Sequence, residues 1–137
     1  MKVVLDTNVI VSALISRNGP PAKILSLALN GKIKIMYDNR ILSEYADVLS
    51  REHFGFNADT VGDVMDYIKY EGEYVNADCL NVQFTDESDK KFYEVCKSGK
   101  AQYLITGNAK HFPADSVVIS PYEFWTIANT QIGKKRI

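Results

Sequence analysis

The sequence has little of several features that define large classes of protein. Its two cysteines, Cys79 and Cys96, form no CxxC pair and have no histidine at zinc-ligand spacing, which excludes a disulfide scaffold and predicts two free thiols. No apolar run approaches the roughly 18 residues of a membrane span. Because the chain also opens without a basic segment followed by a long apolar stretch, we expect a cytoplasmic protein without membrane contact.

Neither sign of charge dominates the chain, and the common nucleotide and nucleophile motifs are missing. Lysine and arginine number 16 against 17 acidic residues, so any nucleic-acid binding has to come from a local basic patch. The sequence contains no GxSxG, GxxxxGK[ST] or GxGxxG motif. It therefore gives no support to an α/β-hydrolase, a P-loop NTPase or a dinucleotide-binding protein.

The composition is that of one globular domain. The chain has 137 residues, of which 46% are hydrophobic and 24% charged. We place the domain at residues 1–130, followed by a short basic tail at 131–137. Apolar residues recur at strand spacing and at helix spacing in alternation, with strands predicted at 2–5, 33–37, the second half of 74–84, 101–106 and 116–119. This alternation predicts an α/β fold with a parallel sheet, right-handed crossovers and helices on both faces.

Four polar residues stand at places where such a fold concentrates chemistry. Asp6 directly follows the first strand, Asp89 follows the predicted strand within 74–84, and Asn108 follows the strand at 101–106. Ligands of open α/β sheets bind at the carboxyl ends of the strands. Glu44 lies in the third predicted helix, about 40° outside the apolar stripe at about 100° per residue, so we expect it to flank the core.

Each of these residues also has a purely structural explanation. Asp6 would help to cap the next helix, for which Thr7 or Asn8 is the predicted cap. Glu44 would be a solvated helix charge, and the acids of 86–89 would complement the dipole of the helix that they begin. The segment Thr106-Gly107-Asn108 would be only a turn. Taken singly, these explanations are the stronger ones. Taken together they weaken, because all four positions recur at equivalent places in the alternation.

A cluster of carboxylates at one sheet edge has a characteristic chemistry. The negative charges repel one another, and a bound divalent cation relieves that repulsion. Ligation by oxygen alone favours Mg²⁺ or Mn²⁺ over zinc. Such a site activates a water molecule for in-line attack on a phosphodiester.

Four segments in order resemble the PIN domain family: VVLDTNVIVSAL, RILSEYADVL, TDESDKKFYEVC and AQYLITGNAKHFP. The resemblance runs from Met1 to about Ile127 and is greatest to the branch of toxin components of toxin–antitoxin pairs. It implies a three-layer α/β/α sandwich with a central parallel sheet. It also implies Mg²⁺- or Mn²⁺-dependent cleavage of RNA, often by a homodimer that pairs with a small antitoxin protein.

The resemblance also implies roles for individual residues. The metal-binding acids would be Asp6, Glu44 and Asp89, with Asn8 and Thr106 supporting them through hydrogen bonds. Asn108 stands where the family often has a fourth acid, and its amide would orient a metal-bound water. The missing charge leaves open whether one or two metals bind, and Asp86 is a partial substitute unless it caps its helix.

Two other interpretations stay open at this point. Asn108 keeps alive a catalytically weakened PIN domain that binds RNA or a protein without turnover. A receiver-like signalling domain also gathers acids at strand ends, although it needs adjacent acids where Asp6 is followed by Thr7 and Asn8. The basic residues that would contact phosphates, or serve only as solubility charges, are Arg17, Lys23, Arg40, Lys100, Lys110 and those of 134–136.

Overall fold

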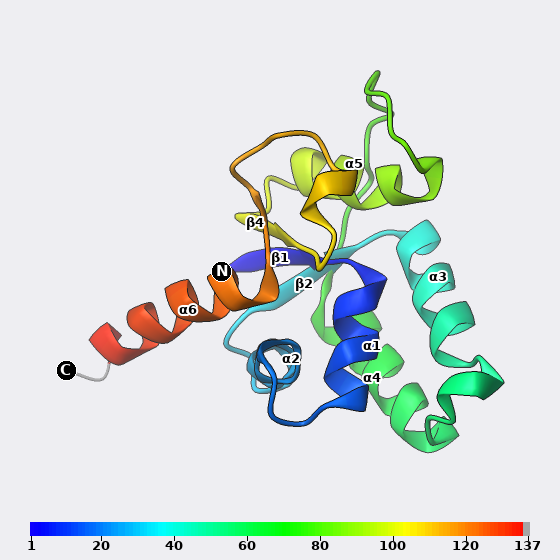
Figure 1. The fold of residues 1–137 in the computed structure, drawn as a ribbon, viewed down its shortest axis with the longest axis vertical. Coiled ribbons are helices and arrows are strands. Elements are labelled where there is room, and N and C mark those ends of the chain that lie inside the picture. Colours follow the sequence, from blue (N-terminus) through cyan, green and yellow to red (C-terminus); the bar gives the residue numbers. More distant parts are fainter. Residues whose placement is uncertain (136–137) are drawn as a thin grey trace.

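Strands and helices alternate along the chain, as the apolar spacing predicts. The computed structural model describes residues 1–135 (Figure 1). The strands are β1 (Lys2–Leu5), β2 (Lys34–Tyr37), β3 (Glu73–Tyr74), β4 (Tyr103–Ile105) and β5 (Val118–Ile119). The α-helices are α1 (Thr7–Ile15), α2 (Pro20–Leu29), α3 (Asn39–Leu49), α4 (Ala58–Glu71), α5 (Lys90–Ser98) and α6 (Pro121–Lys135). Three short 3-10 helices are η1 (Glu52–Phe54), η2 (Glu87–Asp89) and η3 (Ala109–His111).

The five strands form one parallel sheet in the order β3-β2-β1-β4-β5. β1 lies at its centre, in register with β4 through the pairs Val3 with Tyr103, Val4 with Leu104 and Leu5 with Ile105. The predicted parallel α/β sheet is confirmed. Receiver domains have the order 2-1-3-4-5, so the observed order contradicts that interpretation.

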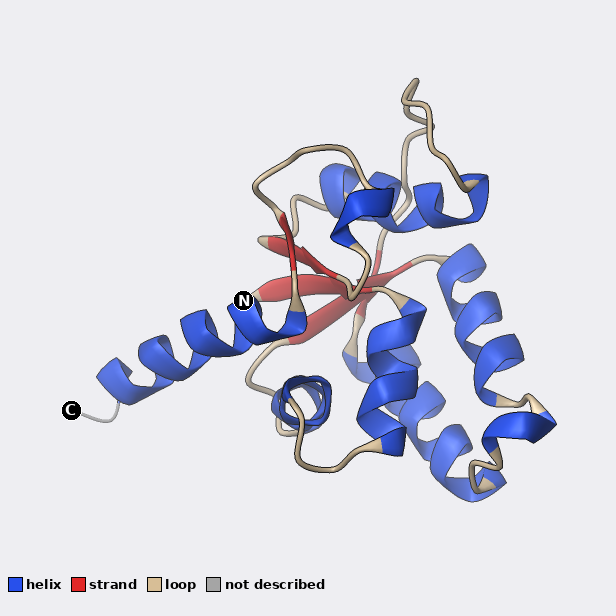
Figure 2. Ribbon diagram, in the orientation of Figure 1, coloured by secondary structure: helices blue, strands red, loops and turns tan. Residues whose placement is uncertain are grey.

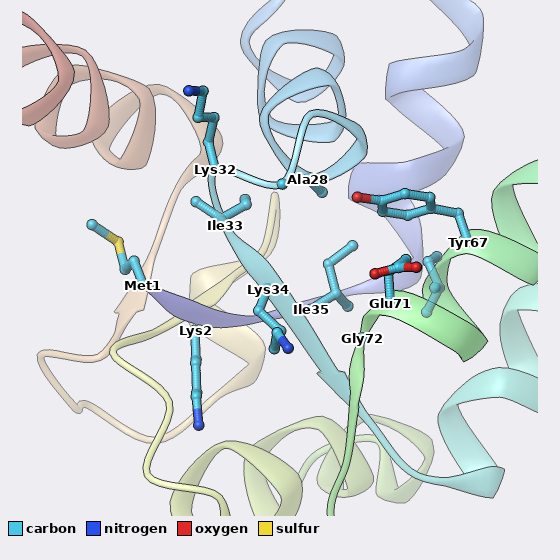
Figure 3. A pocket seen from close by; sticks show the side chains of 12 residues that line it. Met1, Lys2, Ala28, Lys32, Ile33, Lys34, Ile35, Tyr67, Glu71 and Gly72 are labelled. Atoms are coloured by element: carbon cyan, nitrogen blue, oxygen red, sulfur yellow. The ribbon is translucent and has the colours of Figure 1, made fainter.

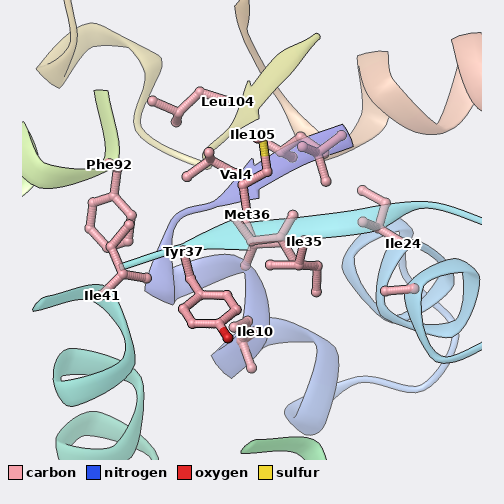
Figure 4. Close-up of a cluster of buried hydrophobic side chains, with 14 of the residues drawn as sticks. Val4, Ile10, Ile24, Ile35, Met36, Tyr37, Ile41, Phe92, Leu104 and Ile105 are labelled. Atoms are coloured by element: carbon pink, nitrogen blue, oxygen red, sulfur yellow. The ribbon is translucent and has the colours of Figure 1, made fainter. Parts of the chain in front are cut away.

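Helices cover both faces of the sheet and complete three layers. In Figure 2, α5 lies across one face, and α1, α2 and α4 lie on the other. β1 is buried by both layers, because Val3, Val4 and Leu5 have no exposed surface. Figure 4 shows Phe92 of α5 and Ile10 of α1 converging on this apolar cluster. The layers match the predicted α/β/α sandwich.

The segment from residue 75 to 86 differs from its prediction. Only Glu73–Tyr74 pairs as a strand, so the strand predicted in the second half of 74–84 is wrong. Side chains of α5 take backbone donors of this segment: Ser98 Oγ accepts from the N–H of Asp78 at 2.9 Å, and Glu94 Oε2 accepts from the N–H of Leu80 at 2.8 Å. The apolar residues at alternating positions pack against the core from an extended loop instead.

α6 is partly a core helix and partly exposed. Phe124 is completely buried, whereas Tyr122 is 70% exposed and Trp125 lies beneath the ammonium group of Lys23 at 5.2 Å. The helix continues to Lys135, past the point where the basic tail was predicted to begin, and extends away from the sheet (Figure 1). Residues 136–137 of that predicted tail lie outside the described part of the chain. Within residues 1–135, no helix is long and apolar enough to span a bilayer.

Candidate active site

Asp6 lies where the strand order of the sheet reverses. From β1 the chain proceeds to β2 and β3 on one side, and later to β4 and β5 on the other. Ligands of open α/β sheets bind in the crevice at this point, outside the carboxyl ends of the strands. The register of β1 and β4 extends one step beyond both strands, because the N–H of Asp6 donates to the carbonyl of Ile105 at 3.0 Å. Asp6 therefore stands opposite Thr106, and its side chain is only 6% exposed.

Thr106 fixes the orientation of the Asp6 carboxylate. Thr106 is completely buried, and its hydroxyl donates to Asp6 Oδ2 at 2.7 Å. The same hydroxyl oxygen accepts from the N–H of Asn108 at 3.0 Å. A hydroxyl has one proton to donate and can also accept, so Thr106 accepts the N–H of Asn108 and still donates its own proton to Asp6. Thr106 thus links the loop after β4 to the buried acid.

The three polar residues after β1 all reach away from their own helix. Asp6 occupies the N-cap of α1 but makes no capping hydrogen bond, so the prediction of Thr7 or Asn8 as the cap is wrong. The Thr7 hydroxyl donates to Glu44 Oε2, and Asn8 Oδ1 accepts from the N–H of Gly107 at 3.4 Å. The polar groups connect β1 to α3 and to the loop after β4. Capping alone does not explain their presence.

Glu44 flanks the core on α3, as its helical position predicts. Its side chain is 26% exposed and is held on both oxygens. Oε2 accepts from Thr7, and Oε1 lies 2.7 Å from the ammonium group of Lys91, which is itself only 12% exposed. Glu44 is therefore part of an ion pair that is largely shielded from water.

Asp89 ends η2 at the start of α5 and is available for other contacts. Its side chain makes no capping hydrogen bond, and its Oδ2 lies 3.7 Å from Nδ1 of His111. The neighbouring Asp86 accepts from the N–H and the hydroxyl of Ser88 at 2.9 and 2.7 Å, so it is the residue that caps this turn. These contacts favour Asp89 over Asp86 as a reactive acid.

The pKa values show that the three predicted acids share one electrostatic site. The pKa of Asp6 is raised to about 6, chiefly because burial disfavours its charge. The hydrogen bond from Thr106 lowers this pKa, whereas the charges of Asp89 and Glu44 raise it further. The pKa of Asp89 is also raised, first by burial and then by nearby acids that include Asp86 and Glu44. The fold therefore brings together three carboxylates that repel one another.

A testable consequence concerns the stability of the fold at different pH. The native pKa of Asp6, about 6, exceeds the ordinary aspartate value of 3.8 that applies to the unfolded chain. Between these two pH values the native state binds more protons than the unfolded state, so the contribution of Asp6 to stability falls as pH rises. We expect Asp6→Asn to be more stable than the wild type by about 1–3 kcal/mol at neutral pH. Urea unfolding of both proteins from about pH 4 to 7.5 measures the difference. The difference in the free energy of unfolding should shrink as pH falls through 6 and vanish near 4. A difference that stays constant with pH would contradict the raised pKa of Asp6.

Asn108 lies in the loop that follows β4, at the same edge of the sheet as Asp6. Its residue is exposed, and its side chain makes no hydrogen bond to any other residue among 1–135. It lines a hollow of about 430 Å³ together with Gly107, Ala109, Lys110 and His111. Because His111 faces Asp89, this hollow adjoins the carboxylates.

The donor chemistry of the acids fits the predicted Mg²⁺ or Mn²⁺, but their arrangement fits it only in part. Carboxylate oxygens are the ligands that these ions prefer. Within the described part of the chain, however, no three histidine, cysteine, aspartate or glutamate side chains form a group that could hold a metal ion. Both oxygens of Glu44 are already engaged, so Asp6 and Asp89 remain as the carboxylates on offer.

A second hollow lies at the opposite edge of the sheet. It measures about 390 Å³ and is bordered by Lys2, Lys32, Lys34 and Tyr67 near the amino ends of β1 and β2 (Figure 3). Lys2 is paired with Glu73 at 2.7 Å. This hollow lacks the buried acid and the strand-end position that distinguish the surroundings of Asp6, which we therefore take as the candidate active site.

Sequence reasoning missed the cations that hold the acids in place. The sequence gives no sign of the role of Lys91, and it suggests only a phosphate contact or a solubility charge for Arg40. Arg40 instead binds Asp38 at 2.7 Å and the nearly buried Glu94 at 2.8 Å. No local signal identifies these pairs, because their members lie on elements far apart in the sequence.

The comparison with known families decides the ancestry of this site. The sequence model of the PIN domain matches residues 2–110, which include all four predicted site residues. The chain belongs to the PIN domain family. PIN domains are generally nucleases, so family and site together support a nuclease-like function.

One curated relative extends the comparison. The PIN domain chain is 36% identical over 112 residues to an uncharacterized protein of Methanocaldococcus jannaschii, an alignment that covers 79% of this chain and 71% of that protein. No solved structure matches the chain.

Proposed function

We propose that this PIN domain is an endoribonuclease that depends on Mg²⁺ or Mn²⁺ and hydrolyses phosphodiester bonds. One observation carries the proposal. Asp6 is a buried acid at the crevice of a parallel sheet, and its pKa is raised first by burial and then by the charges of Asp89 and Glu44. A fold does not keep mutually repelling carboxylates for its own stability, so their grouping indicates a site that uses negative charge.

The residues divide the work of such a site. Asp6 and Asp89 would hold the cation, and Glu44 would join them or position the attacking water. A bound divalent ion supplies a water of lowered pKa and neutralises charge on the phosphate. Thr106 keeps the Asp6 carboxylate in one orientation, and Asn8 ties the start of α1 to the loop after β4. Asn108 presents its amide at the edge of the adjoining hollow.

The RNA backbone would lie in the hollow formed by Gly107 to His111. Its wall carries the basic side chains of Lys110 and His111, both exposed. Nδ1 of His111 lies 3.7 Å from Asp89 Oδ2. Cations on a surface bind nucleic acid through the phosphates, independently of sequence. This arrangement would bring a phosphodiester to the edge of the acid cluster.

The biological setting is also part of the proposal. The segments that resemble toxin components support a toxin that acts in the cytoplasm, pairs with a small antitoxin and forms a homodimer. The exposed Tyr122 on α6 suits a contact between protein surfaces, because aromatic side chains are enriched at such contacts.

Cleavage of a mixed RNA pool tests the activity. We expect fragments when purified protein is incubated with Mn²⁺ or Mg²⁺, no fragments with EDTA, and recovery when Mn²⁺ is returned in excess. Gel analysis of end-labelled RNA measures the result. Equal cleavage with and without EDTA would contradict the metal dependence, and no cleavage under any of these conditions would contradict the ribonuclease.

A second function is favoured by one feature, the asparagine at position 108 in place of an acid. A PIN domain weakened in this way would bind RNA or a protein partner without turnover. Binding of RNA by the wild type without fragments, together with cleavage by Asn108→Asp, would establish this alternative. Because aspartate has the shape of asparagine, the substitution adds a charge at the hollow without disturbing its lining.

A further inference from the structure

Lys91 is the cation of the acid cluster in this structure. Its ammonium group lies 2.7 Å from Glu44 Oε1, also donates to the carbonyl oxygen of Ser88, and stands over the ring of Phe92 at 4.9 Å from its centre. The side chain is 12% exposed. A lysine with three such partners and so little contact with water has a defined position, unlike an ordinary surface lysine.

The position of Lys91 sets its effect on the neighbouring acids. It is the second residue of α5, two residues after Asp89, and it neutralises Glu44, whose charge raises the pKa of both Asp6 and Asp89. A fixed positive charge at this place does two things. It relieves repulsion among the carboxylates, and it repels any second cation that approaches them.

We propose that Lys91 is a positioning residue that holds Glu44 away from divalent metal and so limits the affinity of the site for Mg²⁺ and Mn²⁺. The proposal rests on the metal-dependent function proposed above. A divalent ion that binds Asp6 and Asp89 then competes with the ammonium group of Lys91 for Glu44.

Metal binding by the whole chain, measured without substrate, tests this role. Lys91→Met keeps the length and the contact with Phe92 but removes the charge. We expect it to bind Mn²⁺ about threefold to tenfold more tightly than the wild type. Isothermal titration calorimetry and the electron paramagnetic resonance signal of Mn²⁺ measure the affinity. Lys91→Arg, which keeps the charge, should bind like the wild type.

Lys97→Met is the matched control. Lys97 lies on the same helix and pairs with Asp115 at 2.9 Å, outside the acid cluster. Its replacement changes the net charge equally, so it corrects for long-range attraction, and we expect its Mn²⁺ affinity to stay within about twofold of the wild type. Thermal unfolding without metal verifies that every variant is folded.

The outcomes separate this inference from the function on which it rests. If the wild type binds Mn²⁺ and Lys91→Met binds it no more tightly than Lys97→Met, the inference on Lys91 is overturned and the metal-dependent function stands. If neither the wild type nor Lys91→Met binds Mn²⁺, both are overturned. Should Lys91→Met bind more weakly, Lys91 would support the metal site rather than restrain it, and the inference fails.

Discussion

Replacement of Asp6 by asparagine is expected to reduce RNA cleavage by about 100-fold or more while leaving the fold intact. The substitution keeps the size of the side chain and its place beside Thr106, whose hydroxyl lies 2.7 Å from Asp6 Oδ2. It removes the negative charge, which at neutral pH the native protein maintains against burial and against two neighbouring acids. Loss of activity and gain of stability from one substitution would be typical of a functional acid.

The control for this experiment is Asp63→Asn. Asp63 is an exposed residue of α4, so its replacement changes the net charge equally without touching the candidate site. Rates are measured with end-labelled RNA and saturating Mn²⁺, and stability by urea unfolding at the same pH. Asp63→Asn should cleave at the wild-type rate. Cleavage by Asp6→Asn within threefold of that rate would mean that Asp6 is not the central acid.

The sequence was sufficient to predict the place of Asp6. A short apolar run followed by a carboxylate and by helical apolar spacing places the acid at the end of a buried strand. Parallel strands all end at one edge, so Asp6 and Thr106 were expected at the same edge of the sheet. The strand order, which the sequence did not predict, makes β1 and β4 neighbours and brings the two side chains to 2.7 Å. The helical wheel also placed Glu44 at the margin of the core.

The sequence did not predict features that depend on contacts between side chains of one element and the backbone or charged groups of another. Alternating apolar residues within 74–84 indicated a strand, but the Glu94 carboxylate takes the N–H of Leu80. The pairing of Lys91 with Glu44 depends on the packing of α5 against α3 and leaves no local pattern. Asn108 was placed at the correct sheet edge, but the sequence did not predict that the residue is exposed.

Arg40 also depends on a partner far away in the sequence, and its replacement by methionine is expected to cause a large loss of stability. Arg40 lies 2.8 Å from the carboxylate of Glu94, which is only 3% exposed and otherwise accepts from the N–H of Leu80. Removing the guanidinium leaves a buried charge without its partner. We expect Arg40→Met to lower the free energy of unfolding by about 2–4 kcal/mol, less than for a fully buried pair because Arg40 itself is half exposed.

A double-mutant cycle separates the ion pair from other consequences of the substitution. Glu94→Gln removes the buried charge and keeps an oxygen for the N–H of Leu80, so Arg40→Met combined with Glu94→Gln should recover at least about half of the lost stability. Arg51→Met is the matched control, because its pair with Asp47 is exposed, and we expect a change below about 0.5 kcal/mol. If the double variant were as unstable as the sum of the single variants, the pair would not be coupled. A coupled pair means that Arg40 stabilises the Glu94 carboxylate, which in turn accepts from the N–H of Leu80 in the loop before η2.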